Sequence, residues 1–266
     1  MRLIQILIIF VAVLTAGCKS EFETLRTSNQ PEKIYKAANK YYDEKLYDRA
    51  IALWDVIIQH YRGRQEAEEL FYKYAYAHYY QGDYILASVY FKNFATTFAN
   101  SVNKQEADFM ASYSNYKMSP NYKLDQSYTL KAIEGFEQFA TQYPGTERTE
   151  SANKLIDEMR KKLEKKSFEQ GVLYYKMGQY QAAMTSFENT LKDFAESDQV
   201  EEIRFLILKS SFILASNSIY EKQEERYNKT LDNYNTFIRR HPDSKFAKEA
   251  KSIEKQTLLA LKKLKG

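Results

Sequence analysis

Three stretches of the sequence superpose without gaps: YDRAIALW at residues 47–54, YILASVYF at residues 84–91 and YQAAMTSF at residues 180–187. Each begins with Tyr, has Ala three residues later and has a large aromatic residue four residues after that Ala. The second and third stretches follow a Gly-x-Tyr turn that begins at Gly82 and Gly178. Self-similarity of this kind indicates an architecture built from repeated structural units.

The residue types in the repeat suit pairs of antiparallel helices. A small residue lets two helices approach closely, and the aromatic residue one turn later fills the gap between successive pairs. A weaker copy at residues 128–136 keeps Ala132, and a degenerate copy at residues 227–234 has Thr230 in its place. The pattern resembles the tetratricopeptide repeat. We predict an all-α tetratricopeptide-repeat superhelix of about five helical hairpins, covering about residues 31–264.

Composition supports helices and excludes several classes of protein. The 266 residues include only 8 Gly and 4 Pro, too few turn residues for an all-β sandwich or barrel. With 28% charged and 44% hydrophobic residues the chain is globular rather than disordered. A net charge of +4 gives no reason to expect a nucleic-acid partner. A single Cys cannot form an internal disulfide.

Two regions depart from the regular period. Residues 119–126 include Pro120 and predict an extended loop inside the third repeat. Residues 147–177 contain one Gly and no Pro, so we expect one long helix or two helices nearly end to end. Pro144 and Pro242 end the preceding helices, and Thr146 and Ser244 can cap the following ones.

The N-terminus reads as a lipoprotein signal peptide over residues 1–17. Arg2 precedes an apolar run from Leu3 to Leu14, and small residues precede Cys18. The run is too short to span a bilayer. The sequence TAGC at residues 15–18 resembles the lipobox of bacterial lipoproteins, which implies cleavage before Cys18 and acylation of its thiol. An ordinary secretory leader followed by a chance cysteine is the alternative. Residues 18–30 are predicted to be a lipid-anchored tether.

The mature chain as a whole resembles the BamD family of outer-membrane assembly lipoproteins. The order of lipobox, repeats, insertion and long helix carries the resemblance, together with the segment KLDQS at residues 123–127 and the turn YPGT at residues 143–146. The resemblance implies a non-enzymatic scaffold that binds a large BamA-like β-barrel insertase and unfolded outer-membrane protein clients. Lys19, which follows the cysteine, implies sorting to the outer membrane, with the body facing the periplasm. No cofactor is implied beyond the lipid on Cys18.

A tyrosine-rich strip on the first helices of the repeats is the candidate client groove, in an N-terminal region of residues 31–146. Tyrosine offers contact area at low entropic cost and a hydroxyl that can bond a peptide backbone. The alternative for any one of these residues is simple packing between helices. The strip comprises Tyr35, Asn39, Tyr42, Tyr72, Tyr76, Tyr79 and Tyr113.

The remaining region, residues 147–266, is predicted to hold the long linking helix and the C-terminal repeats that dock the insertase. Its basic residues could meet an acidic partner domain or anionic headgroups, although a solvated helix face is the alternative. The candidate docking residues are Arg160, Lys161, Lys162, Lys165 and Lys166.

The sequence gives no sign of an active site. His60, His78 and His241 fall on different repeats, so no shared metal site is expected. No metalloprotease, nucleophile-elbow or phosphate-loop motif is present. We therefore predict that the protein is not an enzyme. Three other functions remain open: a different envelope tetratricopeptide scaffold in secretion or cell-wall synthesis, a glycan-binding lipoprotein of the SusD type, and a lipid-anchored hydrolase.

Overall fold

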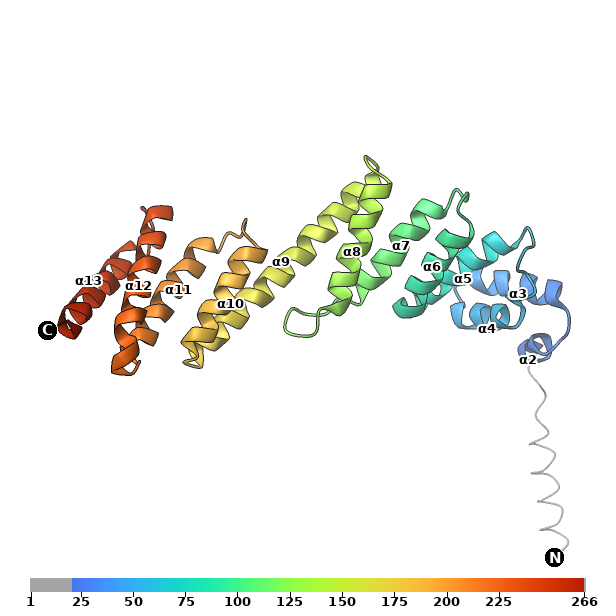
Figure 1. Cartoon of the computed structure of the whole chain (residues 1–266). Coiled ribbons are helices and arrows are strands. Elements are labelled where there is room, and N and C mark those ends of the chain that lie inside the picture. The colour runs from blue at the N-terminus through green and yellow to red at the C-terminus, as the bar shows by residue number, and fades with distance from the viewer. Residues whose placement is uncertain (1–20, 266) are drawn as a thin grey trace, which may run out of the picture. The chain divides into compact units, whose positions relative to one another are not determined.

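The computed structural model describes residues 21–265, and within them every regular element is a helix (Figure 1). The predicted all-α class is thereby confirmed. The described residues divide into two compact units. Unit 1 comprises residues 21–119 and 127–156, and unit 2 comprises residues 120–126 and the chain from residue 157 onward. The predicted signal peptide and Cys18 lie outside the described residues.

The helices of unit 1 form three hairpins preceded by one short helix. They are α2 (Glu21–Arg26), α3 (Pro31–Asp43), α4 (Tyr47–Ile57), α5 (Ala67–Gln81), α6 (Tyr84–Thr97), α7 (Lys104–Lys117), α8 (Ser127–Gln142) and the first part of α9 (Glu147–Lys176). The hairpins are α3–α4, α5–α6 and α7–α8. The short helix α2 lies within the predicted tether, and its Phe22 and Leu25 pack on the core of the first hairpin.

Unit 2 contains two further hairpins and a final helix. Its helices are the second part of α9, α10 (Tyr180–Asp193), α11 (Val200–Ser216), α12 (Tyr220–Arg240) and α13 (Ala247–Leu264). Phe168 of α9 packs against Phe187 of α10, α11 pairs with α12, and α13 packs against both. The five hairpins within residues 21–265 agree with the predicted number. The long helix expected after residue 147 is a single helix of 30 residues.

The repeat residues occupy the buried positions that the pattern predicts. Helices α4, α6 and α10 each begin at the Tyr of their motif. The small residues of the first four hairpins are fully buried, and so are the four aromatic residues that follow them: Ala50, Ala87, Ala132 and Ala183, with Trp54, Phe91, Phe136 and Phe187. In the fifth hairpin Thr230 is buried, but the fully buried aromatic residue is Phe237 and not Tyr234.

The turn between the two helices of a hairpin needs one residue in the left-handed region. Gly82 and Gly178 have φ angles of +83° and +74° there, which glycine adopts without steric cost. In the first hairpin the same position, two residues before the motif Tyr, is occupied by Lys45 with φ of +61°. Among the described residues, Lys45 is the one residue other than glycine that has a positive φ angle, and its backbone is therefore strained.

Replacing Lys45 with glycine is therefore expected to stabilise unit 1 by about 0.5–1 kcal/mol, because relief of the left-handed strain exceeds the added entropy of the unfolded chain. The exposed Lys45 side chain makes no ion pair or hydrogen bond among the described residues that would be lost. The midpoint of guanidinium unfolding, read from the fluorescence of Trp54, measures the effect. Gly82→Ala is the opposite change in the next hairpin and should lower the midpoint; a lower midpoint for Lys45→Gly would contradict the strain.

A serine hydroxyl fixes the turn that leaves the second helix of three hairpins. Ser101, Ser197 and Ser244 each accept a hydrogen bond from the backbone N–H two residues later, at 3.0 Å. Each also donates to a glutamate on the first helix of its own hairpin, namely Glu68 at 2.6 Å, Glu164 at 2.5 Å and Glu201 at 2.5 Å. Each half-buried hydroxyl therefore has both a donor and an acceptor partner within the protein. These bonds tie each hairpin to the turn that follows it.

Thr146 and Ser244 were predicted to cap the helices after them. Thr146 accepts a hydrogen bond from the N–H of Thr149 at 3.2 Å, in the first turn of α9, as predicted. Ser244 instead binds the N–H of Phe246, which precedes the start of α13 at Ala247. It stabilises the turn rather than the helix end.

Candidate functional site

The seven predicted groove residues lie on three helices of unit 1, and each is half-buried. Tyr35, Asn39 and Tyr42 are on α3, Tyr72, Tyr76 and Tyr79 are on α5, and Tyr113 is on α7. Contacts join the helices in sequence: the hydroxyl of Tyr35 donates to Glu69 of α5 at 3.3 Å, and the rings of Tyr79 and Tyr113 are 6.2 Å apart. The structure therefore brings the seven residues, called the tyrosine face below, along one side of adjacent first helices.

The members of the tyrosine face on α3 are largely engaged within the protein. The ring of Tyr35 stacks on Tyr61 with 4.9 Å between centroids. Tyr42 packs against Tyr47 and Trp54, at 5.5 and 5.6 Å. This end of the face has the character of packing between helices, which was the alternative interpretation of the sequence.

The other end of the tyrosine face opens into a groove of about 570 Å³. Tyr76, Tyr79 and Tyr113 line it, and the first part of α9 forms its far wall. The remaining lining residues are Tyr80, Glu106, Phe109, Met110, Arg148, Ser151, Lys154 and Leu155. A groove of this size with an aromatic floor and a few polar groups at its rim has the usual character of a ligand site.

An ion pair crosses the groove wall between α7 and α9. The guanidinium of Arg148 contacts both carboxylate oxygens of Glu106, with Nε–Oε2 at 2.8 Å and Nη2–Oε1 at 2.5 Å. It also lies over the ring of Phe109, 4.5 Å from the centroid, and Tyr76 donates to the same carboxylate at 3.2 Å. Lys154 has no ion-pair partner among the described residues, so the groove keeps one uncompensated cation.

The hydroxyls of Tyr72, Tyr76 and Tyr79 are neutral at physiological pH. Burial raises the pKa of Tyr79 to about 12, and it also raises the pKa of Tyr72 and of Tyr76. An extended peptide offers free backbone carbonyls that the hydroxyl of Tyr79 can bind as a donor. The groove is therefore suited to an extended peptide segment with apolar side chains.

Sequence reasoning missed the part of the groove contributed by residues outside the tyrosine strip. Tyr80 belongs to the same tyrosine-rich helix but falls outside the i, i+4, i+7 pattern that predicts the strip. Arg148, Ser151 and Lys154 recur at helical spacing at the start of α9, but nothing local indicates that this helix packs beside α7. The signal available was the spacing of three, which places the side chains on one face.

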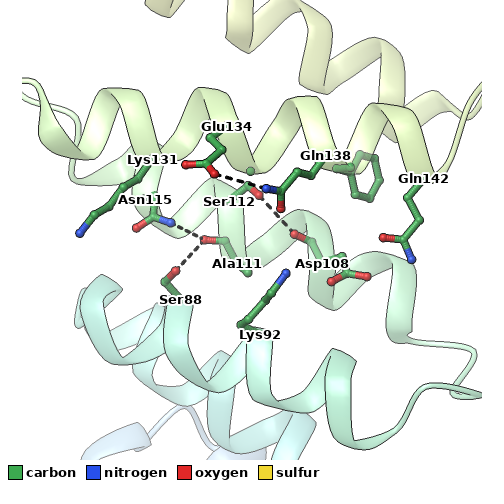
Figure 2. A pocket seen from close by; sticks show the side chains of 12 residues that line it. Ser88, Lys92, Asp108, Ala111, Ser112, Asn115, Lys131, Glu134, Gln138 and Gln142 are labelled. Atoms are coloured by element: carbon green, nitrogen blue, oxygen red, sulfur yellow. Dashed lines mark hydrogen bonds between the residues drawn. The ribbon is translucent and has the colours of Figure 1, made fainter.

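A second pocket, of about 290 Å³, lies among α6, α7 and α8 and is shown in Figure 2. Ser88 and Asn115 both donate to the carbonyl oxygen of Ala111, at 2.9 and 3.4 Å, so these groups are already paired. Its charged lining residues balance, with Lys92 and Lys131 against Asp108 and Glu134. This pocket lacks the aromatic strip of the groove and does not match the predicted site.

The candidate docking residues share the helix α9, in the part that belongs to unit 2. Arg160, Lys161 and Lys165 are exposed, and Lys162 and Lys166 are half-buried. The ammonium of Lys166 donates to the carbonyl oxygens of Tyr122 and Leu124, at 3.2 and 2.8 Å. Lys165 lies 4.8 Å from the ring centroid of Tyr122. These two lysines therefore hold the loop of residues 120–126 against α9.

Residues 21–265 show neither a cluster of three or more His, Cys, Asp or Glu residues that could hold a metal ion nor a helix long and apolar enough to cross a membrane. A model of an outer membrane lipoprotein family, YfiO, matches residues 27–212, from just after α2 into α11. No curated protein matches the chain. The family match covers more than two thirds of the sequence and supports the expected likeness to BamD-type lipoproteins. The chain belongs to the YfiO family of outer membrane lipoproteins.

Proposed function

We propose that this protein is a non-enzymatic scaffold for the assembly of β-barrel proteins in the outer membrane. The family match over residues 27–212 is the observation that supports it most. In this proposal Cys18 carries the lipid, and the folded body faces the periplasm. The scaffold acts by binding alone, with one surface for an unfolded client and another for a BamA-like insertase.

The groove between α5, α7 and α9 is the proposed client site. Its aromatic floor would bury alternate apolar side chains of an extended strand, and the hydroxyls of Tyr79 and Tyr113 would bind its backbone. Lys154 adds a cation that suits the carboxylate at the end of a client chain. These features support capture of a carboxy-terminal segment.

The basic stretch of α9 is the proposed insertase dock. Because Lys165 and Lys166 hold the loop of residues 120–126, the loop and the helix would present one surface to the partner. Arg160, Lys161 and Lys162 would face acidic groups of the insertase, with electrostatic complementarity that favours encounter and orientation.

Removing two groove rings should weaken client capture. For Tyr76→Ala combined with Tyr79→Ala, we expect at least about a tenfold loss of affinity for a barrel carboxy-terminal peptide, since interface tyrosines often contribute more than 1 kcal/mol each. Fluorescence anisotropy of a labelled peptide measures it, with circular dichroism to verify that the helices persist. The matched control is Tyr175→Ala with Tyr180→Ala, a half-buried pair 5.6 Å apart in unit 2. Normal binding by the folded groove variant would refute the client site.

The scaffold role is tested by mild-detergent isolation of the mature protein with a carboxy-terminal tag, followed by mass spectrometry of the partners. Recovery of a large outer-membrane β-barrel with periplasmic domains supports the proposal. Recovery of secretion, cell-wall or glycan-uptake components without such a barrel would refute it and favour one of the alternative scaffolds.

A further inference from the structure

Exposed apolar residues of the first two hairpins gather at one edge of unit 1. At this edge the first helix of each hairpin ends and the second begins. Leu46 is 39% exposed, Tyr80 51%, Ile85 54% and Leu86 38%. These four residues are called the apolar edge below. The opposite edge carries the serine-fixed and arginine-rich turns, and there Val102 is the corresponding exposed aliphatic residue.

Ring contacts join the two turns of the apolar edge into one surface. Tyr80 at the end of α5 stacks on Tyr47 at the start of α4, with 4.9 Å between centroids. Tyr79 packs against Tyr84 at the start of α6, at 5.4 Å. The apolar residues therefore lie side by side on neighbouring hairpins and form a continuous patch. Single exposed apolar side chains are common on protein surfaces, whereas a continuous patch indicates an interaction site.

The described chain begins beside this edge. The ring of Phe22 lies 5.8 Å from that of Tyr41, in the last turn of α3, and the guanidinium of Arg49, in the first turn of α4, lies over Phe22 at 5.9 Å. The carbonyl oxygen of Tyr41 accepts a hydrogen bond from the N–H of Leu46 at 2.8 Å. Helix α2 thus packs against the first hairpin near its turn. Figure 1 shows α2 beside α3 and α4.

The length of chain before α2 limits how far the lipid can lie from the edge. Cys18 precedes Phe22 by four residues, which span at most about 14 Å when fully extended. A lipid on Cys18 would therefore hold Phe22, which packs on the core of the first hairpin, within about that distance of the acylated residue. This step rests on the proposed lipid anchor.

We propose that the apolar edge contacts the lipid bilayer and sets the orientation of unit 1 on the membrane. Leu46, Ile85 and Leu86 would enter the boundary between headgroups and acyl chains, where aliphatic side chains are stabilised by burial. Tyr80 suits the same level, because its ring is apolar and its hydroxyl reaches the headgroups. Lys45, exposed next to Leu46, can meet anionic headgroups. A lipid on one residue only attaches the chain to the membrane. The apolar edge adds a second contact, which fixes the rotation of unit 1 relative to the bilayer.

Unit 2 repeats the pattern within its own hairpins. Leu173 lies in the last turn of α9 and Met177 directly follows that helix, and Ile219 and Tyr220 lie at the turn between α11 and α12. All four are more than half exposed. The recurrence at the same type of turn indicates a property of the repeat and not an accident of one loop.

A site-specific fluorophore tests the proposal, because Cys18 is the only native thiol. The full mature chain is prepared with Ile85→Cys, with Leu46→Cys as a second position, and with Val102→Cys as the control at the opposite edge. An environment-sensitive label is attached, and the protein is placed on vesicles of phosphatidylethanolamine and phosphatidylglycerol. At positions 85 and 46 we expect emission at shorter wavelength, and quenching by lipid-borne nitroxides at least about threefold stronger than at position 102.

A second way of attaching the chain to the vesicle tests the apolar edge independently of the lipid on Cys18. A hexahistidine tag in place of residues 1–18 binds nickel-chelating lipids and holds the same end of the chain at the bilayer without acylation. If the natural chain fails to bind vesicles while the tagged chain shows the expected quenching, the anchor is wrong and the apolar edge stands. Water-like emission at positions 85 and 46 on tagged, vesicle-bound protein overturns the lipid contact and leaves a protein partner as the occupant. Equal quenching at position 102 also overturns it.

Discussion

Replacing Phe91 with alanine is expected to destabilise unit 1 by about 3–5 kcal/mol, the usual cost of removing a fully buried aromatic ring. Phe91 has no exposed surface, and its ring meets that of Tyr76 edge-on at 4.8 Å. The cavity would form in the middle of α6, where the small Ala87 holds the helices too close together for large rearrangement. Because Trp54 is the only Trp of the chain and lies in the core of unit 1, its fluorescence during guanidinium unfolding reports this loss directly.

The same helix supplies the control for Phe91→Ala. Val89→Ala removes a side chain that is half exposed, and surface substitutions of this kind usually change stability by less than about 0.5 kcal/mol. Loss of the Phe91 ring should also weaken peptide binding in the groove, since it supports Tyr76 from behind. Similar unfolding midpoints for the two variants would mean that the repeat aromatic is not the main packing element of the hairpin.

The repeat register was predictable because the same physical requirement recurs in every hairpin. A small side chain and an aromatic side chain four residues apart must both face the partner helix, so the spacing in the sequence carries the information. The spacing of the repeat does not determine which residue occupies the turn, as Lys45 shows. The turn needs a left-handed residue, and Lys45 adopts that conformation although glycine occupies the equivalent position in two other hairpins.

The fifth hairpin and the N-terminal helix were harder to predict. Alignment on Thr230 pointed to Tyr234 as the buried aromatic residue, whereas α12 buries Phe237, which lies two turns after Thr230 on the same face. Helix α2 has six residues, too short for helical periodicity to be recognised, and its stability comes from Phe22 and Leu25 packing on the first hairpin. Both differences arise from tertiary packing that local sequence does not encode.

The candidate site was predictable only where it repeats. Of the predicted strip, Tyr76, Tyr79 and Tyr113 line the groove together with residues of neighbouring helices, and Tyr72 does not. The pair of Glu106 and Arg148 joins residues 42 positions apart, on α7 and α9, which are separated by α8 and by the extended loop that precedes it. No local pattern specifies that distance in space. The roles of the groove and of the basic stretch on α9 stay predictions until binding is measured.

The close approach of α9 and α10 leads to the second large prediction, in unit 2. A Cβ atom at Gly171 would collide with the ring of Phe187, which is fully buried and cannot move aside. Phe187 is confined further by Phe168, at 6.1 Å, and by the hydrogen bond between Ser167 and Thr190 at 2.7 Å. Gly171→Val should therefore destabilise unit 2 by about 2–3 kcal/mol through overpacking, despite the better helix propensity of valine.

The adjacent exposed position gives the matched control, because Gln170→Val introduces the same side chain into the same helix without a facing ring. It should cost no more than about 0.5 kcal/mol, the difference in helix propensity. Circular dichroism would show early loss of helix in Gly171→Val, while the Trp54 transition, which belongs to unit 1, stays in place. Combining Gly171→Val with Phe187→Ala should cost less than the sum of the single changes, because the valine occupies part of the space that the ring leaves. Additive costs would instead mean that the two side chains do not meet, and that another contact sets the separation of α9 and α10.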